Sequence, residues 1–188
     1  MKTLVKNIRA IDPALGLDEV CDILIDGDRI AEVGQDLSAD GAEILDRAGC
    51  IAVPGLVDIH VHLRDPGQEY KETIETGTAA AAHGGFTGIC SMPNTIPTTD
   101  NAATIDYVLD RARSAGHCRV YPSGACTMGL KGESLAEIGD MAAHGAVAFT
   151  DDGRGVQSAG MMRRVMDYAK MFNCCLLYTS DAADEARS

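Results

Sequence analysis

The feature that most constrains the fold is a regular alternation of apolar, strand-like runs with segments of helix length, which begins at residue 56. The strand-like runs cover 56–63, 87–93, 119–127 and 146–152, and the helix-length segments cover 72–85, 101–116, 133–145 and 158–173. Glycines that favour helix ends follow at Gly84, Gly116 and Gly145, and a fifth strand is expected from Cys174. Repeated βα units predict a parallel sheet, in a doubly wound α/β domain or in a (β/α)8 barrel.

The first 54 residues have a different pattern and predict a small β module. "TLVKNIRAI" has the composition of a strand, and "CDILIDGDRIAEVG" that of a β-hairpin with its turn at Asp26-Gly27. No cluster of polar side chains suggests chemistry in this segment. We therefore expect a structural domain at 1–54 and a βα domain at 55–174.

Composition excludes several classes of function. The formal net charge is −12, which opposes binding to nucleic acid, because that affinity comes from clustered lysine and arginine. No apolar run reaches the roughly 18 residues that a membrane span requires. The seven cysteines form no C-x-x-C pair, which predicts reduced thiols in a cytoplasmic protein.

Two histidines, His60 and His62, stand at the end of the first strand-like run, in "VDIHVHLRDPG" (57–67). Their side chains leave the same face of a strand, because strand side chains alternate. Zinc binds neutral imidazole well, so the motif predicts a metal site that needs at least one further protein ligand. The alternative is a pair of core histidines, each satisfied by hydrogen bonds.

An acidic pair, Asp151 and Asp152, ends the fourth strand-like run in "FTDDG". Adjacent strand residues point to opposite faces, so only one of the two carboxylates can face the histidines. Such a pair before a glycine is also typical of a plain turn, and the residues alone leave both interpretations open.

Two further polar residues are expected at the same edge. Asn94 follows the second strand-like run in "MPNT", and Arg64 follows the two histidines. A guanidinium matches a carboxylate in geometry, and in so acidic a chain it indicates a small anionic substrate. The alternative for Arg64 is an ion pair at the rim with Asp65 or Glu69.

These motifs together resemble the dihydroorotases of the amidohydrolase superfamily. The resemblance is carried by two segments, "PGLVDIHVHLRDPGQEYKETIETGTAAAAHGGFTGICSMPNTIPTTDN" and "AFTDDGRGVQ". It is greatest to the bacterial type of dihydroorotase, in which an aspartate takes the place of a carboxylated lysine. Hydantoinases and allantoinases share G-x-x-D-x-H-x-H, but they usually differ after the second histidine and at M-P-N-T.

The resemblance implies a truncated (β/α)8 barrel of about four to five βα units, preceded by a small N-terminal β-sandwich portion. It implies one or two Zn²⁺ ions with His60, His62 and Asp152 as ligands, and Arg64 and Asn94 as residues that hold the substrate carboxylate. The implied reaction is the reversible cyclisation of N-carbamoyl-L-aspartate to L-dihydroorotate in pyrimidine biosynthesis. The implied full-length protein is a cytoplasmic homo-oligomer, and aspartate transcarbamoylase is the partner that the resemblance implies for it. The alternatives are another cyclic amidohydrolase and a non-catalytic, dihydroorotase-like scaffold subunit.

The resemblance stops at about residue 174. A zinc-binding histidine would fall near Thr179, and the general base would lie beyond residue 188. We expect "CLLYTSDAADEARS" (175–188) to be a non-native tail, and the chain on its own to be an inactive N-terminal fragment that contains no catalytic base.

Overall fold

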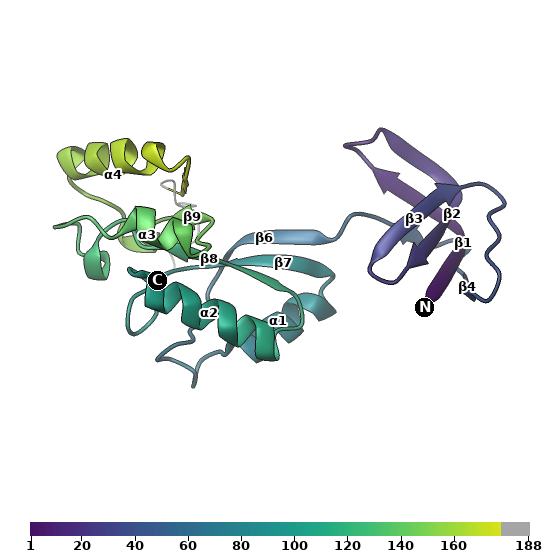
Figure 1. Ribbon diagram of the computed structural model, residues 1–188, viewed down its shortest axis with the longest axis horizontal. Coiled ribbons are helices and arrows are strands. Elements are labelled where there is room, and N and C mark those ends of the chain that lie inside the picture. Colours follow the sequence, from purple (N-terminus) through teal and green to yellow (C-terminus); the bar gives the residue numbers. More distant parts are fainter. Residues whose placement is uncertain (178–188) are drawn as a thin grey trace. The chain divides into compact units, whose positions relative to one another are not determined.

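The computed structural model describes residues 1–177, and the chain divides after Pro54 into two units, Met1–Pro54 and the residues from Gly55 onward (Figure 1). Each unit is described by itself. No helix among the described residues is long and apolar enough to cross a membrane.

The first unit is a mixed five-stranded sheet. Its strands are β1 (Lys2–Asp12), β2 (Leu17–Asp26), β3 (Arg29–Gly34), β4 (Glu43–Asp46) and β5 (Ile51–Ala52). The order is β3-β2-β1-β4, and β5 also pairs with β1. The expected hairpin is present as β2 and β3, and Asp26 pairs with Arg29 across Gly27 and Asp28. Gly27 has a φ of 63°, which suits glycine in this tight turn.

The buried carboxylate of Asp22 stabilises a β-bulge in β1. The pairing of β1 with β2 shifts between Val5 and Ile8, and Asn7 at this bulge has a φ of 60°. Asp22 accepts hydrogen bonds from the backbone N–H groups of Asn7 and Leu37, both at 3.0 Å. The first of these bonds contributes most to lowering the pKa of Asp22 below its ordinary value. The carboxylate therefore satisfies backbone donors that the irregular strand leaves unpaired.

The second unit confirms the expected half-barrel of βα units. Its strands are β6 (Leu56–Val61), β7 (Phe86–Ser91), β8 (Arg119–Gly124), β9 (Ala148–Phe149) and β10 (Cys175–Leu176). Its α-helices are α1 (Ile74–His83), α2 (Ala102–Ala115), α3 (Ile138–Ala143) and α4 (Ala159–Met171), with short 3-10 turns η1 (Met128–Leu130) and η2 (Asp152–Arg154). All strand pairs are parallel. Their spatial order, β10-β9-β8-β7-β6, follows the sequence without a reversal. That order is the winding of a barrel, because a doubly wound sheet reverses at a switch point.

Two clusters of buried side chains fix the helices to the sheet. Leu63, Ile74, Ile89, Val108 and Val120 form the cluster that joins α1 and α2 to β7 and β8, and Figure 1 shows both helices along these strands. A second cluster packs α3 and α4 around Phe149, which is fully buried. The carboxyl ends of the strands are thereby held at one edge of a packed unit.

Several predicted boundaries were wrong. The strand expected at 119–127 ends at Gly124. The strand expected at 146–152 ends at Phe149. Beyond it, Asp151 is held by hydrogen bonds from the backbone N–H groups of Cys126 and Thr127, and Asp152 has a φ of 52°, which is incompatible with an extended strand. The helix expected at 133–145 begins only at Ile138. The residues before it pair instead with the segment that follows β8, where the N–H of Ala136 donates to the carbonyl of Cys126 at 3.0 Å.

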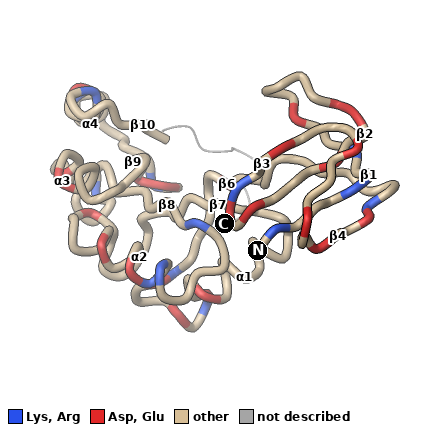
Figure 2. The backbone as a smooth tube through the Cα atoms, turned by 45° about the vertical axis from the view of Figure 1, so that its right-hand side comes forward, with Lys and Arg blue, Asp and Glu red and all other residues tan. Residues whose placement is uncertain are grey.

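Figure 2 shows positions of both charge signs scattered along the described chain, and acidic residues predominate in the sequence.

The first testable prediction concerns Asp151, which is only 3% exposed. It accepts hydrogen bonds from the backbone N–H groups of Cys126 and Thr127, at 2.9 and 3.0 Å, and from the Thr127 hydroxyl. Asp151→Ala leaves buried donors unpaired, so we expect a loss of about 3 kcal/mol in the free energy of unfolding, measured by urea denaturation. Asp167→Ala removes only an exposed ion pair on α4 and should cost less than about 0.5 kcal/mol. Equal losses in the two variants would contradict the prediction.

The second prediction concerns His144 at the end of α3. Its Nδ1 lies 3.0 Å from a carboxylate oxygen of Asp106, and this hydrogen bond raises the pKa of His144 above its ordinary value. The stabilisation is complete below the pKa of the unfolded chain, about 6.5, and is lost as the pH rises through the higher pKa of the folded chain. An NMR titration should give a pKa above 6.5, and Asp106→Asn should lower it. An unchanged titration in that variant would contradict the assignment.

Candidate metal centre

The carboxyl ends of three parallel strands bring the predicted site residues together. His60 lies in β6 and His62 just after it, Asn94 follows β7, and Asp152 follows β9. In parallel βα folds the carboxyl edge of the sheet is where functional sites form. The four side chains lie at this edge although they are spread over more than 90 residues of sequence.

A bulge in β6 orients the first histidine. Asp58 pairs with Ile89 and Val61 with Ser91, so β6 has one residue more than β7 across this stretch. The backbone N–H of His60 donates to Oδ1 of Asp58 at 3.0 Å. Asp58 is a site residue that our sequence analysis missed. The signal was the D-x-H spacing, since an aspartate commonly accepts a hydrogen bond from the N–H two residues on.

His60, His62 and Asp152 present donor atoms to a common point. Nε2 of His60 lies 3.1 Å from Oδ1 of Asp152, and Nε2 of His62 lies 4.0 Å from the same oxygen. The ligand atoms of all three residues lie within 4.8 Å of one another. The side chain of Asp152 is 13% exposed and that of His60 is 53% exposed, so the group is open to solvent on its histidine side.

This donor set fits a zinc ion. Two atoms that bind one ion at about 2.0–2.1 Å with tetrahedral angles lie roughly 3.3–3.4 Å apart. The distances of 3.1 and 4.0 Å from Asp152 to the two histidines bracket that value. Two imidazoles and a carboxylate are also a common three-residue set in catalytic zinc sites, which keep a further position open.

Asn94 lies between two members of the group. Its Nδ2 donates to Oδ2 of Asp152 at 2.6 Å, and its Oδ1 lies 2.9 Å from Nδ1 of His62. Both contacts involve the atom of the partner that does not face the common point. Gln68 stabilises the loop that contains Asn94, because its Nε2 donates to the backbone carbonyl of Asn94 at 3.3 Å.

The two adjacent aspartates have different environments, although they lie beyond the end of β9 and not within a strand. Asp151 points into the protein and holds the backbone of residues 126 and 127. Asp152 points to the histidines, and its N–H donates to the Thr150 hydroxyl at 2.9 Å. A φ of 52° places Asp152 in the left-handed region, which is unfavourable for a non-glycine residue and is commonly found at functional sites.

Arg64 lies in the loop after β6 and also has a left-handed backbone, with a φ of 61°. No residue of the described range 1–177 forms an ion pair with its side chain. The alternative partners are engaged elsewhere. Glu69 accepts from the backbone N–H of Gly67 at 2.7 Å, and Asp65 is 2% exposed and faces α2.

Asp65 anchors this loop to α2. The Tyr107 hydroxyl donates to Oδ1 of Asp65 at 2.8 Å, and Nε of Arg111 lies 3.8 Å from Oδ2. Burial and the hydrogen bond to Asp65 raise the pKa of Tyr107. A buried carboxylate held by a phenol and a guanidinium fixes the chain one residue away from Arg64.

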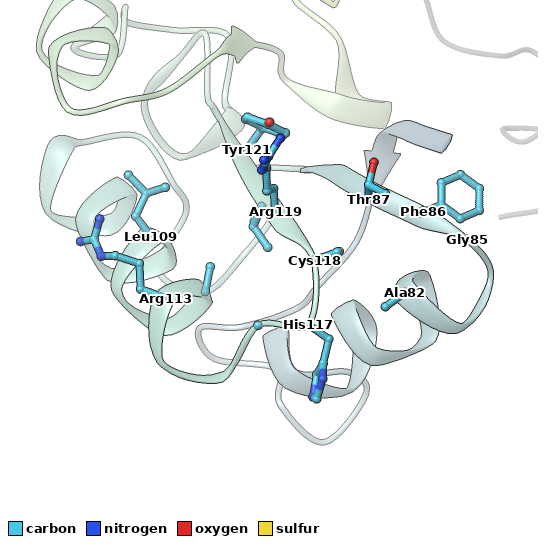
Figure 3. A pocket seen from close by; sticks show the side chains of 13 residues that line it. Ala82, Gly85, Phe86, Thr87, Leu109, Arg113, His117, Cys118, Arg119 and Tyr121 are labelled. Atoms are coloured by element: carbon cyan, nitrogen blue, oxygen red, sulfur yellow. The ribbon is translucent and has the colours of Figure 1, made fainter. Parts of the chain in front are cut away.

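A hollow at the opposite edge of the sheet, where the strands begin, has no group of polar side chains that point toward one another. It lies where β7 and β8 begin, and Arg113, His117 and Arg119 are among its lining residues. Figure 3 shows these three side chains pointing in different directions. Polar side chains that diverge cannot bind one small ligand together, so the carboxyl edge is the better candidate.

Curated relatives share the sequence over almost the whole chain. A dihydroorotase of Syntrophotalea carbinolica is 57% identical over 96% of this chain and 43% of its own length. A dihydroorotase of Geobacter sulfurreducens is 53% identical over 90% of this chain and 40% of its own length. The chain thus spans about two fifths of the length of these relatives.

Solved structures agree on the fold. An L-hydantoinase (dihydropyrimidinase) from Arthrobacter aurescens superposes with a TM-score of 0.80 at 25% identity, over 93% of this chain and 39% of that one. A family model described as dihydro-orotase-like matches residues 49–185. This match extends past residue 174, and the non-native origin of 175–188 stays a prediction, since residues 178–188 lie outside the described part. Because the matched residues make up most of the sequence, the chain belongs to the dihydro-orotase-like family.

Proposed function

We propose that this chain is the N-terminal part of a zinc-dependent dihydroorotase, which interconverts N-carbamoyl-L-aspartate and L-dihydroorotate. The observation that carries the proposal is the convergence of His60, His62 and Asp152 close in sequence to an arginine with no ion-pair partner within residues 1–177. A metal centre and a cation suit a substrate that has both a cyclic amide and a carboxylate. The identity of 57% to a dihydroorotase supports this choice of substrate.

His60, His62 and Asp152 would hold the zinc ion. When bound, zinc polarises the amide carbonyl and lowers the pKa of a coordinated water to about 7. The imidazoles contribute neutral nitrogen donors, and the carboxylate of Asp152 offsets part of the charge. The exposed histidine side of the group is free for a substrate, because the side chain of His60 is 53% exposed and that of Asp152 is 13% exposed.

Arg64 and Asn94 would hold the substrate carboxylate. A guanidinium binds a carboxylate through two parallel N–H donors, which orients as well as attracts it. The amide of Asn94 has two N–H donors, and Asp152 accepts one of them. The second has no acceptor within residues 1–177, so Asn94 can contact both Asp152 and a substrate.

The remaining parts of the proposal concern the longer protein. The resemblance places the general base beyond residue 188 and a further zinc-binding histidine near Thr179, which lies outside the described residues. We propose a cytoplasmic homo-oligomer that takes a small anionic substrate and associates with aspartate transcarbamoylase. Co-purification of the two proteins tests the association.

A chimaeric enzyme tests the activity. Residues 1–174 would replace the matching portion of the Syntrophotalea carbinolica relative, which supplies the rest of the fold. We expect hydrolysis of dihydroorotate and little of hydantoin or allantoin. The hydantoinase alternative is supported by the TM-score of 0.80, and preference for hydantoin would favour it. A folded, zinc-loaded chimaera that hydrolyses none of the three would favour the non-catalytic alternative.

The third prediction concerns the metal ligands. His60→Ala and Asp152→Ala should each weaken zinc binding by more than about 100-fold, since loss of a ligand exceeds the 10- to 100-fold effect of an outer contact. Competition with a chromophoric chelator measures the dissociation constant. His83→Ala changes an exposed histidine at the end of α1 and is the control. Equal zinc affinity in all three variants would refute the assignment.

The fourth prediction concerns Arg64 in the chimaera. Arg64→Met removes a charged pair of hydrogen bonds to the substrate, so kcat/KM for dihydroorotate should fall about 10- to 100-fold. Zinc content should not change, because Arg64 is not a proposed ligand. Arg113→Met, on the exposed surface of α2, should leave both quantities unaltered. If Arg64→Met kept the kcat/KM of the unaltered chimaera, the proposal that Arg64 binds the substrate would be wrong.

A further inference from the structure

We propose that Asn94 is a positioning residue for the metal centre: it fixes which nitrogen of His62 and which oxygen of Asp152 face the ion. The inference rests on the proposed zinc site and goes beyond the role of Asn94 as a substrate contact. It is carried by two hydrogen-bonding contacts of one amide group, to two proposed ligands that follow different strands.

The first step is the orientation of the amide. An ionised carboxylate only accepts hydrogen bonds, so the Asn94 atom 2.6 Å from Oδ2 of Asp152 must be the Nδ2 donor. The carbonyl oxygen Oδ1 then has to face Nδ1 of His62, which lies at 2.9 Å. The contact to Asp152 thus determines the chemistry of the contact to His62.

The second step is the tautomer of His62. The carbonyl oxygen of Asn94 has no proton to donate, so Nδ1 of His62 must carry the hydrogen. A neutral imidazole protonated at Nδ1 has its lone pair on Nε2. Nε2 is the atom that faces Oδ1 of Asp152, at 4.0 Å. Asn94 therefore prepares His62 to bind a cation before any cation arrives.

The third step concerns which oxygen of the Asp152 carboxylate faces the ion. Oδ2 of Asp152 accepts from Asn94, and Oδ1 lies toward both histidines. The left-handed backbone of Asp152 places the side chain in this position, and the hydrogen bond prevents its rotation. Outer contacts of this kind commonly raise metal affinity by 10- to 100-fold.

The decisive measurement is ¹⁵N NMR of the histidine rings in the metal-free chain, with His62 assigned from the signal that disappears in His62→Gln. We expect His62 to be protonated at Nδ1. Asn94→Leu replaces the amide with an apolar group of similar size, so the preference for that tautomer should be lost and zinc should bind about 10- to 100-fold more weakly.

Gln68→Leu is the matched control. It makes the same change of an amide to leucine in a residue that contacts the backbone of Asn94, but not His62 or Asp152. We expect the tautomer and the zinc affinity of this variant to match those of the unaltered chain. If Gln68→Leu lost as much zinc affinity and tautomer preference as Asn94→Leu, the effect would come from the loop and not from the amide of Asn94, and the proposal would be overturned.

Two other results would also overturn it: protonation of His62 at Nε2 in the unaltered chain, or an unchanged tautomer in Asn94→Leu. Because the tautomer is read without metal, failure of the chain to bind zinc would count against the proposed function alone. The NMR result would still decide whether Asn94 orients His62.

Discussion

Parallel pairing from β6 to β9 is the constraint on which the site depends. Each strand contributes few site residues, and those residues are far apart in the sequence. Parallel pairing places all the carboxyl ends at one edge, and the buried clusters behind β7, β8 and β9 hold that edge rigid. A site that requires donor atoms within a few ångströms of each other needs such a scaffold, since small displacements weaken both metal binding and substrate orientation.

Carboxylates do most of the local positioning at this edge. Asp58 satisfies the N–H left free by the bulge at His60, Asp65 ties the loop of Arg64 to α2, and Asp151 holds the end of β8. Only Asp152 turns toward the histidines. The chain therefore uses one acid as a proposed ligand and several as structural acceptors, which gives each irregular segment of the edge a partner for its backbone.

The sequence was sufficient to predict the βα repeat, the hairpin at Gly27 and the grouping of side chains at the carboxyl edge. Hydrophobic periodicity and strand alternation carry that information. It did not predict that the fourth strand stops at Phe149 or that residues 133–137 are not helical, because hydrogen bonds between distant segments decide both. The contact between Asn94 and His62 was also beyond prediction, since it joins residues that follow different strands. Asp58 was predictable from its spacing to His60.

We propose that two imidazole nitrogens and one carboxylate oxygen of this chain bind the same zinc ion. Seven cysteines are also available, and all those within the described residues are free thiols, so sulfur ligands are the chemical alternative. X-ray absorption spectroscopy of the zinc-loaded chain separates the two, because zinc lies about 2.0–2.2 Å from nitrogen and oxygen but about 2.3 Å from sulfur. We expect a shell of nitrogen and oxygen atoms only, with the multiple-scattering signature of two imidazoles. A sulfur shell, or a single imidazole, would contradict this account.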